Sequence, residues 1–157
     1  MALLALLPLA FGVDVSRCDW HDSVERKGDT GAREVADGYF GLSVKAGDGD
    51  ITKALRAAIE QRLHAGGVTN LVDNPVTRPR ADVVLEEGQM RWLPFYASVK
   101  ARVRVLLTRK GKIAEAGLDT RATVEGTCWG LVSQHAWRNA LIDRLADHAA
   151  HGILPDK

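Results

Sequence analysis

Apolar and polar residues alternate along two neighbouring segments in the middle of the chain. In residues 99–107 valine, alanine or leucine occupies every second position, and lysine or arginine occupies most positions between them. Residues 114–124 repeat this alternation after a turn at Lys110 and Gly111. Because successive side chains of a strand point to opposite faces, the pattern predicts a hairpin with one buried face. Pairing Arg109 with Lys112 would set three pairs opposite each other: Val103 with Leu118, Val105 with Ala116, and Arg102 with Asp119.

Two other segments carry apolar residues at helical spacing. Asp50 can cap a first helix that begins at Ile51 and ends at Gly66, with Ile51, Leu55, Ala58, Ile59 and Leu63 on its inner face. Ser133 can cap a second helix, which Gly152 and Pro155 end. Its expected inner stripe consists of Trp137, Ala140, Leu141, Arg144, Leu145 and Ala149.

The first forty residues contain weaker patterns. Alternation over residues 11–16 predicts a strand with one buried face. Residues 17–38 are rich in charge and glycine, which is typical of a long loop. A short strand over residues 39–44 would follow that loop.

Between the first helix and the hairpin we expect extended structure interrupted by turns. Residues 68–72 can form a brief strand, and residues 73–80 contain two prolines without periodicity, which favours a loop. Residues 81–92 predict a long strand with a bulge at Glu86, Glu87 and Gly88, followed by a bend at Pro94. Without that bulge, Glu86 and Glu87 would point to opposite faces of the strand.

This order of elements predicts an α+β fold in which two amphipathic helices pack on one face of an antiparallel β-meander sheet. Residues 11–157 would form a single domain of ordinary size. Residues 1–10 are apolar and too short to span a bilayer, which takes about 20 residues. They fit a clipped secretory signal, a signal of unusual form, or part of the first strand.

Composition narrows the classes of function. The chain has 157 residues, of which 46% are hydrophobic and 26% charged, and its formal net charge is +1. These values exclude a disordered chain, and they argue against a protein built as a whole to bind nucleic acid. We therefore expect no nucleic-acid partner, although the basic residues between positions 100 and 112 keep nucleic-acid or anion binding as an alternative.

Cys18 and Cys128 can form a disulfide in an oxidising compartment or remain two separate thiols. They also support an alternative function, a small metal-binding protein or enzyme built on Cys18, His21 and Cys128. A closed zinc site needs a fourth ligand, which would be His64, His135, His148 or His151. The sequence shows no second paired ligand motif, no nucleophile elbow and no nucleotide-binding loop. We therefore expect no catalytic residue, no metal and no cofactor.

Aromatic residues give the best candidate for a binding surface. Trp92, Phe95 and Tyr96 lie around Pro94, and aromatic side chains exposed at a bend offer a large contact area at low entropic cost. The same residues equally fit a second interpretation, as core residues at a corner of the sheet. The neighbouring basic strand would extend this surface with Lys100, Arg102 and Arg104. Trp129 and Trp137 lie close to the second helix, and we expect both of them in the core.

Most of the chain takes part in a resemblance to known proteins. It covers GVDVS, ITKALRAAIEQRLHAGGV, ADVVLEEGQMRW, ASVKARVRVLLTRKGKIAEAGLDTRATVEGTCWG and the helix from Ser133. Together these segments resemble the YajG-like family of uncharacterised bacterial outer-membrane lipoproteins. This resemblance implies a domain in the periplasm, tethered to the outer membrane by an acylated cysteine, and it brings no catalytic residue. Here Arg17, rather than a small residue, precedes Cys18. The resemblance thus implies a non-catalytic accessory protein of the cell envelope whose partner is an envelope protein or lipid.

Overall fold

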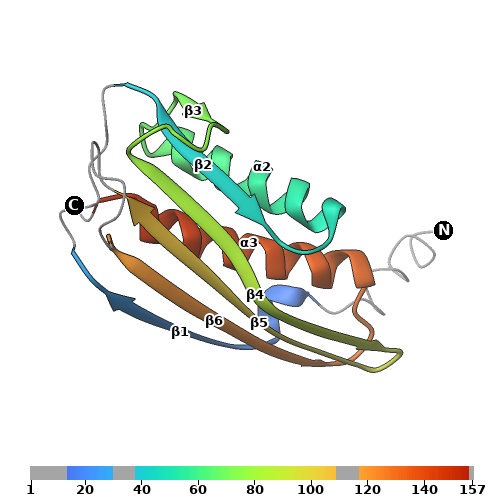
Figure 1. Cartoon of the computed structure of the whole chain (residues 1–157). Helices are drawn as coiled ribbons and strands as arrows, with labels where there is room; N and C mark the ends of the chain where they lie inside the picture. The colour runs from blue at the N-terminus through green and yellow to red at the C-terminus, as the bar shows by residue number, and fades with distance from the viewer. Residues whose placement is uncertain (1–13, 30–37, 109–116, 156–157) are drawn as a thin grey trace.

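The computed structural model describes residues 14–29, 38–108 and 117–155. These residues form one six-stranded sheet in the order β1-β6-β5-β4-β2-β3. Helices α2 and α3 cover one face of the sheet, which we call the inner face; the other is the outer face (Figure 1). The elements are a short 3-10 helix η1 (Val15–Arg17), β1 (Asp19–Lys27), β2 (Phe40–Lys45), α2 (Gly49–Ala65), β3 (Leu71–Val72), β4 (Arg80–Leu93), β5 (Tyr96–Thr108), β6 (Asp119–Trp129) and α3 (Gln134–Ile153).

The α+β class with two helices is confirmed. Strands β4, β5 and β6 form the expected antiparallel meander, and β1 joins it antiparallel to β6. The meander does not extend to the other edge, because β2 pairs in parallel with β4 and β3 pairs in parallel with β2. Helix α2 connects the parallel strands β2 and β4, as such a pair requires a crossover connection.

The hairpin of β5 and β6 forms in a different register from the predicted one. Val103 lies opposite Ala122, and Val105 lies opposite Thr120, so the expected pairs with Leu118 and Ala116 were wrong. The shift is an even number of residues, which leaves every side chain on its predicted face. Alternation alone therefore could not distinguish the two registers. The expected pair of Arg109 with Lys112 lies outside the described residues.

The first strand lies where we expected a loop. Asp14 caps the 3-10 helix η1, and β1 then runs through charged residues 19–27 of the predicted loop. The strand was missed because it is almost entirely exposed, so neither of its faces needs to be apolar. After β1, residues 28–29 and 38–39 form neither helix nor strand, and residues 30–37 lie outside the described residues. The predicted strand at 11–16 was wrong for its described part, because Val15 and Ser16 belong to η1.

Both helices begin close to their predicted caps. Helix α2 starts at Gly49 rather than Ile51, because the side chain of Asp48 rather than Asp50 accepts the first backbone N–H. Ser133 caps α3 as predicted. The buried residues of α3 differ in part from the predicted stripe, since Ala140, Leu141 and Arg144 are only half-buried. Among the residues that are buried instead are Ile142, Ala146, Ala150 and Ile153.

The inner face of the sheet carries the main core. Alternate residues of β5, from Ala101 to Leu107, meet Leu55, Ile59 and Leu63 of α2 and the buried side of α3. The two helices are also joined by Arg62 of α2, which bonds to the carboxylates of Asp143 and Asp147 of α3.

Among the described residues, no helix is both long and apolar enough to span a membrane.

A second, smaller core lies at one end of the sheet. It consists of Ala97, Val99, Cys128, Val132 and Trp137. Trp137 is fully buried, as predicted, and its indole N–H donates to the carbonyl of Ser98. Trp129 is 76% exposed, so the expectation of a core residue was wrong. It lies one position after the buried Cys128 and therefore points to the outer face.

Cys18 and Cys128 form a disulfide beside this second core. The bond joins the residue before β1 to the end of β6, across 110 positions of sequence. Closing so long a loop restricts the unfolded chain, and the chain-entropy model assigns about 4–5 kcal/mol to a loop of this size. The disulfide therefore stabilises the attachment of the outermost strand β1 to the sheet.

We predict that replacing both cysteines, Cys18→Ala with Cys128→Ala, lowers the free energy of unfolding by about 3–5 kcal/mol. Urea denaturation followed by tryptophan fluorescence measures the loss. A thiol reductant should destabilise the natural protein to a similar extent and leave the double variant unchanged. Equal stability of the oxidised protein and the double variant would contradict the prediction.

Candidate functional site

The turn between β4 and β5 contains the predicted bend. Leu93 pairs with Tyr96, so Pro94 and Phe95 form a two-residue turn. Phe95 is 67% exposed at the end of this turn. Its backbone carbonyl accepts a hydrogen bond of 2.9 Å from the N–H of Gly130, which follows β6. The turn is therefore tied to the end of the neighbouring strand.

Aromatic side chains occupy both faces of the sheet next to this turn. Trp92 lies opposite Ala97 on the inner face, and its indole N–H donates to the carbonyl of Val132. Tyr96 lies opposite Trp129 on the outer face, with 4.5 Å between the ring centroids. Trp92 and Tyr96 therefore share one end of the sheet without sharing a face.

These residues belong to an exposed apolar cluster, which we call the aromatic tip. Of the ten large hydrophobic side chains that are exposed among the described residues, six lie here. Clustered exposed apolar surface marks contact sites more often than scattered residues do. The aromatic tip consists of Met90, Trp92, Leu93, Phe95, Tyr96, Trp129 and Leu131. Trp129 was missed as a surface residue, although its place after Cys128 in the strand alternation could have indicated its exposure.

The predicted basic residues continue along β5 from Tyr96 on the outer face, and each lies near a carboxylate. The amine of Lys100 lies 3.7 Å from Glu125, and Arg102 lies 3.8 Å from Glu87. Arg104 bonds to Asp119 at 2.8 Å, and this hydrogen bond raises the pKa of the guanidinium above its ordinary value. Arg102 faces Thr123, so the predicted pair of Arg102 with Asp119 was wrong.

The predicted bulge in β4 supplies two of these carboxylates. The register of β4 against β5 shifts between Leu85 and Glu87. As a result, Glu86 and Glu87 both reach arginines of the outer face, with Glu86 lying 3.4 Å from Arg121. The outer face is thus a network of opposite charges rather than a continuous basic surface. Arg109, Lys110 and Lys112 of the predicted basic run lie outside the described residues.

The structure does not assemble the alternative metal site. Cys18 and Cys128 are bonded to each other, so neither is available as a thiolate ligand. His21 and Asp22 are neighbours on β1 and point to opposite faces of the sheet. No group of three or more histidine, cysteine or acidic residues is arranged for a metal ion within ranges 14–29, 38–108 and 117–155.

A groove of about 860 Å³ separates β1 from α3 on the inner face. Asp22 lies in it and accepts bonds from Arg144 at 3.1 Å and from His148 at 2.7 Å. Arg144 also lies 4.4 Å over the ring of Trp20. The same indole stacks on Trp137, with 4.8 Å between centroids, and its N–H donates to the carbonyl of Val15. The polar groups at the centre of the groove are therefore bonded to one another, and they hold β1 against α3.

Gly126 of β6 allows this packing. A Cβ atom at that position would lie 2.6 Å from the six-membered ring of Trp20, so the indole packs closely against the backbone of β6. Trp20 therefore connects three elements, since it also contacts Trp137 and Arg144 of α3.

We predict that Asp22→Ala lowers the free energy of unfolding by about 1 kcal/mol, because Arg144 and His148 lose their shared acceptor at a partly solvated position. Thermal and urea denaturation measure the change. Asp22→Asn keeps an acceptor oxygen and should lose less stability than Asp22→Ala. If both variants were as stable as the natural protein, the bonds across the groove would contribute nothing to its stability.

Comparison with known proteins identifies the fold of this chain, but it does not assign the chain to a family. No family model matches the sequence, and no curated protein sequence matches it. A superposition on a PelC dodecamer from Paraburkholderia phytofirmans gives a TM-score of 0.53 at 14% sequence identity. The match covers 87% of this chain and 100% of the PelC chain. A single-residue variant of the same dodecamer gives a TM-score of 0.51 at 15% sequence identity, with the same coverage of both chains. A minor lipoprotein from Acinetobacter baumannii has a TM-score of 0.42 at 19% identity, covering 73% of this chain and 92% of that chain. The chain therefore has the fold of the PelC subunit, and the YajG-like resemblance stays a prediction.

Proposed function

We propose that the protein is a non-catalytic accessory domain of the bacterial cell envelope, which acts by contact of its aromatic tip with an envelope protein or lipid. The observation that carries this proposal is the concentration of exposed aromatic side chains around Phe95 and Trp129. Tryptophan and tyrosine contribute a large share of binding energy at interfaces, since they bury much area for few rotatable bonds.

The aromatic tip is held in shape before any partner binds. The two-residue turn fixes the backbone of Phe95, the bond to Val132 holds the indole of Trp92, and the ring of Tyr96 packs against that of Trp129. Ordering side chains at an interface costs about 0.5–1.5 kcal/mol for each flexible group. Because part of the aromatic tip is already ordered in the free protein, binding of a partner loses less side-chain entropy there. This favours a role of the tip as a contact surface.

Three observations support a location outside the cytoplasm. The disulfide of Cys18 with Cys128 fits an oxidising compartment such as the periplasm. The apolar residues 1–10 suit an export signal, and the YajG-like resemblance implies a periplasmic domain associated with the outer membrane.

The fold shared with the PelC dodecamer supports a role carried out through contacts between proteins.

The chemistry of the described residues supports a contact function over the alternatives. Both cysteines are engaged in the disulfide, so the metal-binding or enzymatic alternative lacks its sulfur ligands. Lys100, Arg102 and Arg104 each lie near a carboxylate, which reduces their attraction for a phosphate group. The proposal thus includes no nucleic acid, metal or cofactor.

The compartment is tested by fractionating source cells and trapping free thiols in them. We expect the protein in the periplasmic or outer-membrane fraction, with Cys18 and Cys128 protected from a thiol-reactive maleimide until a reductant is added. A cytosolic protein with both thiols reactive would contradict the proposed location.

The contact surface is tested by placing a photo-crosslinking amino acid at Phe95 or, as a control, at Val76. The two positions are 67% and 77% exposed, and Val76 lies in a loop remote in sequence from the aromatic tip. We expect a specific protein or lipid adduct from position 95 in source cells and none from position 76. The adduct at 95 should be lost when Trp129→Ser is added.

Protein and lipid adducts are distinguished by their shift on denaturing gels and by mass spectrometry. Phe95→Ser and Val76→Ser should have similar stability, because both side chains are largely exposed. Equal or absent adducts at positions 95 and 76 would contradict a contact function of the aromatic tip.

A further inference from the structure

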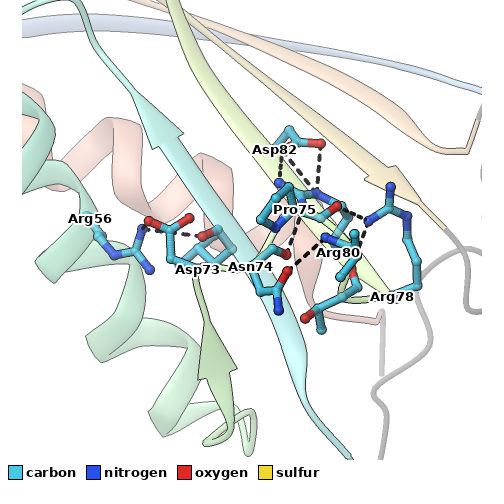
Figure 2. Close-up of polar contacts among 10 residues, drawn as sticks. Arg56, Asp73, Asn74, Pro75, Arg78, Arg80 and Asp82 are labelled. Atoms are coloured by element: carbon cyan, nitrogen blue, oxygen red, sulfur yellow. Dashed lines mark hydrogen bonds and ion pairs between the residues drawn. The ribbon is translucent and has the colours of Figure 1, made fainter.

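The two edges of the sheet differ in how well they are covered. At one edge, β3 has two residues and pairs only with Phe40 and Gly41 among the described residues. Beyond it, Arg56 of α2 donates to the carbonyl of Leu42 and lies 3.6 Å from Asp73. Figure 2 shows Arg56 and Asp73 together beside β2. Short strands and covering side chains block further strand pairing at such an edge.

The loop after β3 covers the adjoining part of this edge. Arg80 donates to the carbonyl of Asn74 at 3.0 Å and bonds to Asp82 at 2.7 Å, while Arg78 donates to the carbonyl of Pro75 (Figure 2). A Cβ atom on Gly41 would lie 2.9 Å from the Cβ of Arg80, so the strands and this loop are closely packed.

Within the described ranges, the opposite edge of the sheet is a long open strand. β1 has nine residues and pairs with β6 along its whole length, from Asp19 to Lys27. No other strand of the described ranges follows it in the sheet. Eight of its nine residues are exposed. An edge of this length presents backbone donors and acceptors to any strand that can pair with it.

The charges of β1 are ordered along its outer face. Asp19, His21, Ser23, Glu25 and Lys27 lie on this face, because they pair with the outer-face residues of β6 from Thr127 to Asp119. An acid therefore stands at the start of the strand and a base at its end. A strand with this order complements itself when a second copy runs antiparallel to it.

We propose that β1 pairs antiparallel with β1 of a second copy of this chain, centred on Ser23, to form a two-fold dimer with a continuous sheet. In this register Asp19 lies opposite Lys27 of the second copy, and His21 lies opposite Glu25. The symmetry repeats each pair, so two opposite-charge pairs of Asp19 with Lys27, and two pairs in which the imidazole of His21 can donate a hydrogen bond to Glu25, flank the central serines. Opposite charges that face each other across strands stabilise a sheet, and like charges destabilise it.

Neighbouring registers lack this complementarity. Centring the pairing on Asp22 would place Asp19 opposite Glu25, which are both acidic. Centring it on Val24 would place His21 opposite Lys27. The outer face thus selects the register centred on Ser23.

The inner face accepts the same register. Trp20 lies opposite Arg26 of the second copy, and Asp22 lies opposite Val24. An acidic residue beside valine is tolerated here because Arg144 and His148 already bond to the carboxylate of Asp22. The groove between β1 and α3 would face its counterpart across the symmetry axis.

Sedimentation of the full chain over a range of concentrations tests the dimer. We expect Asp19→Lys or Lys27→Glu alone to weaken dimerisation by about tenfold or more, since each substitution places two pairs of like charges together. The double variant that carries both substitutions should dimerise as the natural protein does. An equimolar mixture of the two single variants should form a heterodimer, because each then supplies the charge that the other lacks.

A cysteine scan tests the register. Opposed residues of antiparallel strands have Cα atoms about 4.5–5.5 Å apart, which suits a disulfide. Ser23→Cys should therefore form a disulfide-linked dimer under mild oxidation. Glu25→Cys should not, because the two positions 25 would lie about 14 Å apart along the strands.

The aromatic tip provides the control surface. Phe95→Ser with Trp129→Ser should leave dimerisation unchanged, so loss of the tip contact and loss of the dimer are separate results. A monomer at every concentration would overturn the proposal. So would a dimer that is insensitive to the charge variants, or one in which Glu25→Cys forms the linkage as readily as Ser23→Cys.

Discussion

The strict alternation of side chains along β5 is the constraint on which the rest of the structure depends. Its odd-numbered residues from Ala97 to Leu107 are buried, β4 and β6 pair on either side of it, and the buried sides of α2 and α3 belong to the cores that these residues form. The even-numbered residues are left to the outer face, where Arg102 and Arg104 meet the carboxylates of Glu87 and Asp119. One strand thus determines both an apolar face that requires two helices and a charged face that neutralises itself.

The edge strand β1 is attached by different interactions. It contributes little to the main core, and it is held by its pairing with β6, by the disulfide of Cys18, and by Trp20 packed between Gly126 and α3. Burial of apolar area, the usual source of stability, is small for this strand. A covalent bond and one aromatic anchor compensate, which leaves the remaining residues of β1 free to be polar.

These two modes of attachment explain which elements could be predicted from the sequence and which could not. The helices and the strands β4 to β6 could be predicted because burial imposes a period on their residues. The register of β6 could not, because a shift by an even number of residues preserves every face. β1 escaped prediction since its exposed residues carry no period, and the parallel strands β2 and β3 are too short to reveal their direction. At the aromatic tip, Phe95 followed from its bend, whereas the exposure of Trp129 follows only when the alternation of β6 is extended past Val124 to Cys128.

The two proposed contact surfaces place a geometric condition on each other. Asp19 begins β1 at the end of the sheet that carries the aromatic tip, opposite Thr127 and close to Trp129. In an antiparallel pair centred on Ser23, Asp19 of one copy adjoins Lys27 of the other, so the two tips lie at opposite ends of the continuous sheet. The outer faces of both copies lie on the same side of that sheet, because opposed residues of antiparallel strands point to the same face. A flat surface can therefore reach Trp129 and Tyr96 of both copies only along the outer face, and not at the ends of the strands. Pairing through β1 thus suits two protein partners bound at the two ends of the dimer, whereas a lipid contact of both tips requires the whole outer face, which is charged along β5, to lie against the lipid.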